Sequence, residues 1–200
     1  YLKPDDYGVA SQALAIIAEN IPAWAYTELG AQALGAISVG VYHTSVAAEV
    51  EYVLTYTDAS VVLCEDEEQV DKLLERRAAL GQVRRVIVED PRGMSKHAGD
   101  DWIMTFGDLL ALGRAQPEDH YAREAALGHP DDVCHFSLTS GTTGQPKAAM
   151  LSHRNLLFMG QSLGQVEGFR AGQDYLSFLP MAWIGEQMMT VGVALANGVT

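Results

Sequence analysis

The sequence is most informative where it reads Leu138-Thr139-Ser140-Gly141-Thr142-Thr143-Gly144-Gln145-Pro146-Lys147. Short apolar runs at residues 133–138 and 148–151 flank this stretch, which indicates a loop between two strands. Its nine residues from Thr139 hold four hydroxyl side chains, two glycines and one lysine. Glycines allow close backbone approach, successive N–H groups can form a concave nest for an anion, and the lysine adds positive charge. The loop is therefore predicted to bind phosphate groups, such as those of a triphosphate or pyrophosphate.

The loop has two other interpretations, a Walker A loop and a hydroxyl-rich surface loop. A Walker A loop requires Gly before the lysine and Ser or Thr after it, whereas here Pro146 precedes Lys147 and Ala148 follows it. Proline also lacks the N–H that the Walker glycine supplies, so a P-loop nucleotidase is not expected. A surface loop rich in Ser, Thr and Gly, with a solvated lysine, stays open on the residues alone.

Outward from the loop, short apolar runs alternate with longer segments of helical period. This alternation predicts an α/β fold, built from βαβ units with a mostly parallel sheet. Residues 115–132 could serve as a linker within the domain. Strands are expected at residues 13–18, 37–42, 61–64, 83–88, 133–138, 148–151 and 175–179, and helices from Pro22, at 47–56, 66–80 and 105–114, from Ser152, and at 186–196.

The composition of the chain indicates a globular protein and argues against a nucleic acid partner. The 200 residues are 48% hydrophobic and 20% charged, as in ordinary globular proteins. Thirteen Lys and Arg against 26 Asp and Glu give a net charge of −13, and the basic residues are scattered. Such a surface repels nucleic acid phosphates, so no nucleic acid partner is expected. The uncharged stretch at residues 29–48 contains polar side chains and glycines, which favours a buried helix and strand over a membrane span.

Cysteine and histidine positions argue against a disulfide framework and a metal centre. Cys64 and Cys134 lie far apart in the sequence, which favours a reducing compartment and a cytoplasmic location. The closest grouping of metal-binding residue types comprises Cys134, His129, His135 and His153. These residues fall on a predicted strand and its flanks, so a metal site there is not expected.

The loop closely resembles the phosphate-loop signature of the adenylate-forming superfamily, which includes acyl-CoA synthetases, luciferases and the adenylation domains of peptide synthetases. That signature reads Thr-Ser-Gly-Thr-Thr-Gly, any residue, Pro-Lys, and residues 139–147 match every fixed position. Residues 150–155 and 18–24 are also similar to family segments, so the resemblance covers nearly the whole chain. Two positions depart from the pattern, because Leu138 stands where Tyr is common and Ala148 where Gly is usual.

A second run, Leu179-Pro180-Met181-Ala182-Trp183-Ile184-Gly185-Glu186-Gln187, resembles the family motif that lines the substrate pocket. Its form is most similar to that of bacterial long-chain fatty acyl-CoA synthetases. A strand end with a tryptophan in the core is the alternative interpretation. An aromatic residue at the carboxyl end of a strand is well placed for a ligand, because open α/β sheets bind there.

The resemblance implies ATP-dependent ligation of a fatty acid to coenzyme A, with ATP, Mg²⁺ and coenzyme A as cofactors or co-substrates. Residues 140–144 would cradle the β- and γ-phosphates, and Lys147 would add positive charge there. Thr139 and Lys147 would be the catalytic residues. The Thr139 hydroxyl would also meet magnesium or phosphate, and Trp183 and Ile184 would shape the acyl or nucleotide pocket. The residues expected to bind the nucleotide are Thr139, Ser140, Gly141, Thr142, Thr143, Gly144, Pro146, Lys147, Trp183 and Ile184.

The resemblance also implies a domain assignment for the chain. Residues 1–200 are expected to form part of the large N-terminal AMP-binding domain, truncated at both ends and without the C-terminal lid domain, so that this chain alone would be inactive. An aryl- or amino-acid-activating enzyme and a non-catalytic nucleotide-binding remnant are the alternatives. Long-chain acids partition into bilayers, so peripheral membrane contact is compatible with the sequence. The sequence leaves the oligomeric state open.

Overall fold

A single twisted sheet organises the chain in this computed structural model, which describes residues 12–139 and 144–199. Its strands lie in the order β5-β4-β3-β1-β2-β6-β7, and every neighbouring pair is parallel except β6 and β7. This arrangement confirms the predicted α/β fold with a mostly parallel sheet. The strands are β1 (Ala13–Ile17), β2 (Ile37–Val41), β3 (Ala59–Cys64), β4 (Arg85–Val88), β5 (Ile103–Thr105), β6 (Val133–Thr139) and β7 (Lys147–Ser152).

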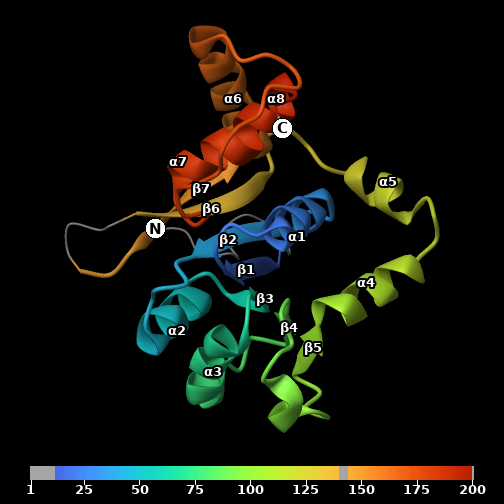
Figure 1. The fold of residues 1–200 in the computed structure, drawn as a ribbon, viewed down its shortest axis with the longest axis vertical. Helices are drawn as coiled ribbons and strands as arrows, with labels where there is room; N and C mark the ends of the chain where they lie inside the picture. Colours follow the sequence, from blue (N-terminus) through green and yellow to red (C-terminus); the bar gives the residue numbers. More distant parts are fainter. Residues whose placement is uncertain (1–11, 140–143, 200) are drawn as a thin grey trace.

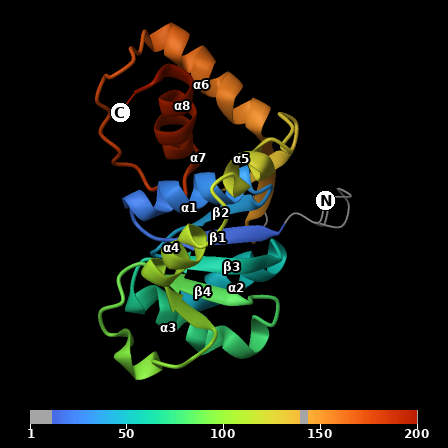
Figure 2. The same cartoon turned by 90° about the vertical axis from the view of Figure 1, so that its right-hand side faces the viewer.

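Helices cover both faces of this sheet. Figure 1 shows α2 and α3 on one side of the strands, with α1 and α4 on the other. Helices α6, α7 and α8 stack beyond α1 at one end of the molecule (Figure 2). The α-helices are α1 (Pro22–Ala33), α2 (Ala47–Tyr56), α3 (Glu67–Arg76), α4 (Phe106–Arg114), α5 (His120–Ala125), α6 (His153–Glu167), α7 (Ile184–Glu186) and α8 (Ala194–Asn197); the short 3₁₀ helices are η2 (Arg77–Ala79) and η3 (Met94–His97), and a π-helix, η4, spans Gln187–Val193.

Local sequence signals set the helix starts. Pro22 is the first residue of α1, where its missing N–H costs nothing. The Ser152 hydroxyl accepts the Asn155 N–H at 3.2 Å and caps α6, which begins where the helix from Ser152 was predicted. Thr105 caps α4 in the same way through the N–H of Asp108. Capping fixes where each helix leaves its strand.

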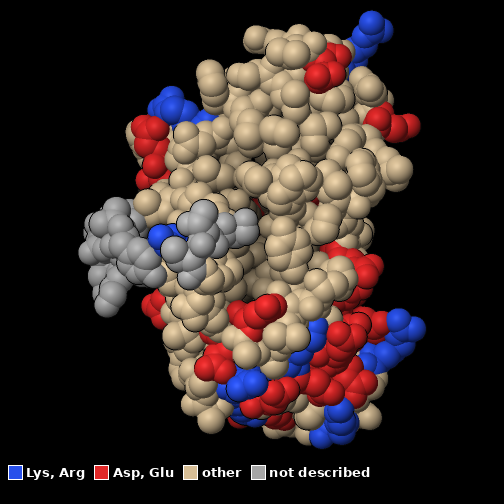
Figure 3. Space-filling model, turned by 90° about the vertical axis from the view of Figure 1, so that its left-hand side faces the viewer, with Lys and Arg blue, Asp and Glu red and all other residues tan. Residues whose placement is uncertain are grey.

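Charge is unevenly distributed over the surface. On the face drawn in Figure 3, acidic and basic side chains gather over the lower half, and the upper half carries few of them. Ion pairs of α3 account for part of this region, including Lys72 with Glu68 at 3.2 Å and Arg76 with Glu75 at 3.1 Å. In the part of the chain that the structure describes, no helix combines the length and apolar character that a bilayer crossing needs.

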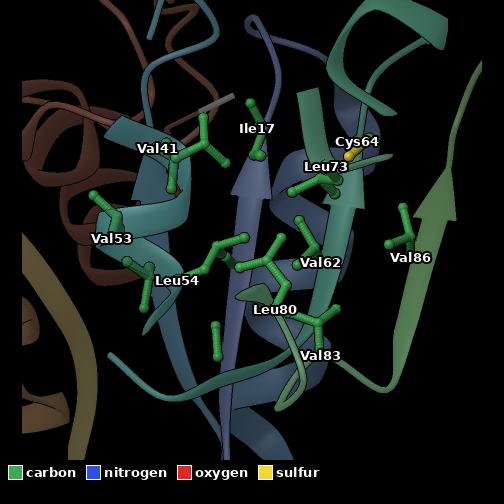
Figure 4. Close-up of a cluster of buried hydrophobic side chains, with 14 of the residues drawn as sticks. Ile17, Val41, Val53, Leu54, Val62, Cys64, Leu73, Leu80, Val83 and Val86 are labelled. Carbon is green, nitrogen blue, oxygen red and sulfur yellow. The ribbon is translucent and has the colours of Figure 1, made fainter. Parts of the chain in front are cut away.

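Two apolar clusters hold the layers together, one on each face of the sheet. The larger cluster packs α2 and α3 against the strands, and Figure 4 shows part of it around Leu54, Val62 and Leu73. The second cluster joins α1 to the opposite face through Trp24, which is 1% exposed, together with Ala182. Burial of large apolar side chains contributes roughly 1.5–3 kcal/mol each, so these clusters supply the main stabilisation of the fold.

One sequence prediction about an element was wrong and two were incomplete. Residues 175–179 form no strand; the Leu179 N–H donates to the Glu186 side chain at 3.2 Å and its carbonyl accepts from Asn20 at 2.8 Å, so side chains take the place of a ladder. The helix predicted at residues 186–196 lies within the helical residues 184–197, but its middle is the π-helix η4 between α7 and α8. The linker at residues 115–132 contains the short helix α5.

Candidate functional site

The antiparallel hairpin β6–β7 carries the predicted loop. Thr139 ends β6 and pairs in register with Lys147, the first residue of β7. The Thr139 hydroxyl donates to the Lys147 carbonyl at 3.1 Å, so the two sides of the loop are joined at its base. Gly144 has φ +113°, a conformation that favours glycine. Four of the predicted site residues lie outside the described residues: Ser140, Gly141, Thr142 and Thr143.

Two tyrosines of α2 support the return of the loop. The Tyr52 hydroxyl donates to the Pro146 carbonyl at 2.9 Å, and the Ala148 N–H donates to the Tyr56 hydroxyl at 3.4 Å. The two rings stack with their centroids 5.6 Å apart. The loop therefore returns to the sheet along a rigid aromatic surface.

A cavity of about 780 Å³ opens beside the hairpin. Five predicted residues line it, and they come from both sequence motifs: Thr139, Gly144, Pro146, Trp183 and Ile184. A cavity of this size accommodates a nucleotide or a drug-sized ligand. It lies where the carboxyl ends of β2 and β6 meet, which is where open α/β sheets bind ligands. Lys147, by contrast, is exposed and does not line the cavity.

Asn20 and Gly40 place the segment that leads to Trp183. The Asn20 amide donates to the Leu179 carbonyl at 2.8 Å, and its oxygen accepts the Met181 N–H at 3.2 Å. At Gly40 an added Cβ would lie 2.7 Å from the Ala182 Cα, which is too close for any side chain. The segment can therefore rest directly on β2. Trp183 is left 46% exposed, with its ring available to a ligand.

Among the lining residues that the sequence interpretation missed are the polar ones that follow β2: Tyr42, Ser45, Glu49 and Tyr52. Glu49 caps α2, because its carboxylate accepts the Val46 N–H at 3.3 Å. The usable signal was the polar run that follows a buried strand, since the carboxyl ends of parallel strands share one edge of the sheet. No spacing rule connects Tyr52 to Pro146, because this contact is purely tertiary.

The cysteines and histidines do not form a reactive or metal-binding group. Burial raises the pKa of the Cys134 thiol to about 12 and also raises the pKa of Cys64, so neither thiol is an activated nucleophile. His135 is buried at 1% exposure and faces Glu28 and Ser38 instead of a metal. Within residues 12–139 and 144–199, no group of three or more His, Cys, Asp or Glu could hold a metal ion.

Magnesium bound to a nucleotide needs few protein ligands, because it keeps several waters and the phosphate oxygens as ligands. The Thr139 hydroxyl is an oxygen ligand of the kind that this ion prefers. It donates its own proton to the Lys147 carbonyl, so its lone pairs are directed away from that bond. The donor chemistry at this position therefore fits magnesium.

Comparison with known proteins finds long-chain-fatty-acid–CoA ligases among the relatives of this chain. A long-chain-fatty-acid–CoA ligase of Xenopus laevis is 27% identical over 187 residues, which are 92% of this chain and 25% of that protein. The long-chain-fatty-acid–CoA ligase heimdall of Drosophila melanogaster is 30% identical over 186 residues, 91% of this chain and 27% of that protein. This chain thus spans about a quarter of the length of the curated relatives it matches.

Solved structures share the fold. Acetoacetyl-CoA synthetase from Streptomyces lividans superposes with a TM-score of 0.78 at 20% identity, over 94% of this chain and 29% of that one. A protein from Rhodopseudomonas palustris that is assigned as a long-chain-fatty-acid CoA ligase superposes with a TM-score of 0.73 at 23% identity, over 94% of this chain and 44% of that one.

Residues 6–200 match the family described as AMP-binding enzyme. The chain therefore belongs to the AMP-binding enzyme family.

Proposed function

We propose that this chain forms the nucleotide pocket and part of the acyl pocket of an ATP-dependent long-chain fatty acid–CoA ligase. One observation carries the proposal: Thr139 of the phosphate-binding loop and Trp183 of the second motif line one cavity, although they lie far apart in the sequence. Membership of the AMP-binding enzyme family and the fatty-acid ligases among its relatives support the same assignment. The domain assignment of residues 1–200 to an N-terminal AMP-binding domain belongs to this proposal.

The proposed reaction has two halves. The fatty acid carboxylate attacks the α-phosphate of ATP, so that an acyl-adenylate forms and pyrophosphate leaves. The thiol of coenzyme A then attacks the acyl carbon, forms the thioester and releases AMP. The chain's contribution is to position the reactants and to stabilise charge, as in other phosphate chemistry.

Each loop residue has a role in that scheme. Residues 140–144 are proposed to cradle the β- and γ-phosphates through backbone N–H groups and hydroxyls. Lys147 follows the loop, and its exposed, positively charged side chain is proposed to extend toward the phosphates although it does not line the cavity. Thr139 would hold the magnesium that ATP brings, and this ion supplies neutralisation of phosphate charge when bound.

Trp183 and Ile184 line the cavity together with Thr139. The half-exposed indole offers a flat apolar surface on which an adenine ring or an acyl chain can pack. Long-chain acids partition into bilayers, so the proposal includes peripheral contact with a membrane. The cytoplasm is the proposed location, since Cys64 and Cys134 are both unpaired and buried.

The test is carboxylate-dependent exchange of pyrophosphate into ATP, measured on the protein encoded by the complete gene. Acids of different chain length, aryl acids and amino acids are supplied in turn. Exchange driven by long-chain acids is expected. Exchange with aryl or amino acids alone would assign another adenylating activity, and ATP binding without any exchange would indicate a non-catalytic nucleotide-binding protein. Either result contradicts the proposal.

Lys147→Ala tests the phosphate assignment in the same assay. Loss of one charge-assisted contact is expected to raise the KM for ATP by about tenfold or more. The matched control is Lys96→Ala, since Lys96 pairs with Glu67 at 2.6 Å, far along the chain from the loop. An unchanged KM for ATP in Lys147→Ala would remove this lysine from the site.

A further inference from the structure

A buried carboxylate, that of Glu28, contacts two elements that lead to the cavity. Glu28 of α1 is 0% exposed, and its side chain sits in the interior between α1, the sheet and η4. An isolated carboxylate costs several kcal/mol when it is removed from water, so its partners decide its state. No sequence signal marked Glu28 as more than a helix residue.

Five donors converge on this carboxylate. Oε1 accepts from the Gln32 amide at 3.2 Å and the Ser38 hydroxyl at 2.9 Å, and it lies 3.2 Å from His135 Nδ1. Oε2 accepts from the Trp24 indole and from the Gln187 amide, both at 2.9 Å. A carboxylate with acceptors only matches such a set, whereas a protonated acid would oppose one donor with another.

The pKa of Glu28 agrees with an ionised state. Burial alone would raise the pKa of Glu28, but hydrogen bonds from His135, Gln187 and Ser38, together with the charge of His135, lower it below its usual value. Glu28 is therefore a fixed negative centre inside the protein.

Two of these donors lie on the elements that lead to the two walls of the cavity, the Thr139 wall and the Trp183 wall, although neither donor lines the cavity itself. His135 lies on β6, the strand that ends at Thr139. Gln187 begins η4, and its amide also donates to the Met181 carbonyl at 2.9 Å, in the segment that leads to Trp183. One carboxylate thus connects the strand that presents the loop with the segment that presents the indole.

Stability alone is a poor account of this cluster. Well-packed apolar residues of similar volume are often as stabilising as a buried ion pair, or more so. Here His135 Nε2 and Gln187 Oε1 are also buried with no hydrogen-bond partner among the described residues. Buried polar atoms without partners cost free energy. The cluster instead fixes the relative positions of its side chains, because charge-assisted hydrogen bonds are strong and geometrically specific.

We propose that Glu28 is a positioning residue, whose carboxylate acts through His135 and Gln187 to hold the Thr139 end of β6 and the Trp183 segment at the separation that ATP requires. This inference rests on the proposed function for its nucleotide. Its mechanical part, the coupling of the two walls, does not depend on which reaction the protein performs.

The first arm of the test uses no nucleotide. Amide hydrogen exchange is compared between wild type, Glu28→Gln and Gln187→Met, in peptides covering β6, residues 180–193 and β3. Glu28→Gln keeps the shape and removes the charge, and Gln187→Met removes the amide that joins Glu28 to Met181. Both variants are expected to speed exchange in β6 and in residues 180–193 together, and to leave β3 unchanged. Equal acceleration in all three peptides would indicate general destabilisation and would overturn the proposal.

The second arm measures the KM for ATP and kcat in the pyrophosphate exchange assay with the full-length protein. Both variants are expected to raise the KM for ATP about tenfold, with a smaller change in kcat. The matched control is Gln69→Met, because Gln69 is a buried glutamine on α3, away from the cavity. It should lower the melting temperature without changing the KM for ATP. Coupled exchange with an unchanged KM would overturn the role in nucleotide binding.

Failure of the proposed function gives a different result. If the wild-type protein neither binds ATP nor exchanges pyrophosphate with any acid, the ligase assignment is wrong and the role of Glu28 toward ATP falls with it. The hydrogen-exchange arm still decides whether Glu28 couples the two walls. If Glu28→Gln fails to fold, Gln187→Met carries both arms, since it leaves the carboxylate and its other donors in place.

Discussion

At the scale of single residues, Tyr52 shows how one hydroxyl supports the loop from outside its motif. Its bond to the Pro146 carbonyl lies at the point where the loop returns to β7. Tyr52→Phe keeps the stacked ring and removes that bond, so the free energy of unfolding should fall by about 1 kcal/mol. The KM for ATP should rise about threefold to fivefold, because the loop loses a support. Urea unfolding and the exchange assay measure the two effects.

Tyr26→Phe is the control for this prediction. Tyr26 is 69% exposed on α1, so loss of its hydroxyl should leave both quantities unchanged. A Tyr52→Phe variant with reduced stability and an unchanged KM would show that the bond supports the fold alone.

Asp100 gives a prediction about pH. Its carboxylate accepts from the Arg77 guanidinium at 2.5 Å and 3.0 Å, and from the Trp102 N–H at 3.0 Å, and these bonds lower the pKa of Asp100 below its ordinary 3.8. The unfolded chain therefore binds this proton more tightly than the folded protein. The stabilisation is present above about pH 3.8 and is lost as the pH falls below it.

Asp100→Asn should accordingly reduce the free energy of unfolding near neutral pH, and the deficit should shrink as the pH falls to about 3. Urea unfolding at several pH values measures it. Arg77→Ala removes the two guanidinium bonds, leaves the Trp102 N–H bond in place and should show a deficit that shrinks over the same pH range. A deficit that stays constant with pH would mean that the pair contributes packing, such as the contact of Arg77 with the Trp102 ring, and no charge-dependent stability.

At the scale of elements, α6 crosses η4 and α8 through glycines. A Cβ added at Gly160 would collide with the Gly192 carbonyl, and one added at Gly164 would collide with the Asn197 side chain. The Asn197 amide donates to the Gly160 carbonyl at 3.0 Å across this crossing. Close approach of the backbones therefore replaces interdigitated side chains here.

Gly160→Ala should lower the free energy of unfolding by about 1–3 kcal/mol, because the helices must separate. Gly113→Ala on α4 is the matched control, since no heavy atom lies within 4 Å of an added Cβ there. It should be neutral or stabilise by up to about 1 kcal/mol. Thermal melting distinguishes the two, and equal behaviour would show that the crossing can relax freely.

The elements also show how much of the fold can be predicted from the sequence. Strands β1 to β4 and helices α1 to α3 follow periodicity and caps, and they were predicted within a few residues. The segment at 175–179 looked like a strand, yet its main chain is held by Asn20 and Glu186, which only the tertiary fold brings near. The π-helix η4 has no periodic signature in the sequence, since its apolar pattern is compatible with an α-helix.

At the scale of the whole molecule, the site also contains residues that local motifs predict and residues whose role depends on tertiary contacts. Thr139, Gly144, Pro146 and Trp183 were predictable because each lies in a local motif. Tyr52, Glu28 and His135 were not assigned to the site, since their importance arises from contacts across the sheet. Local sequence therefore predicts the groups that would touch a ligand more readily than the groups that hold them.

The net charge of −13 leads to a prediction about salt. Repulsion between like charges opposes the compact state, and salt screens it. Salt also weakens the ion pairs on α3, but exposed pairs contribute only about 0–1 kcal/mol each. The melting temperature is expected to rise between low salt and about 0.3 M sodium chloride. Scanning calorimetry measures it, and a falling melting temperature would show that the ion pairs dominate.

The pairing of Thr139 with Lys147 restricts how this protein can vary. Because the hairpin fixes both ends of residues 140–146, an inserted or deleted residue must either change the loop length or slip β7 along β6. A slip by one position turns every side chain of β7 to the other face of the sheet. Descendants of this sequence should therefore exchange residues within the loop while keeping its length, and insertions should collect in the connections outside the hairpin.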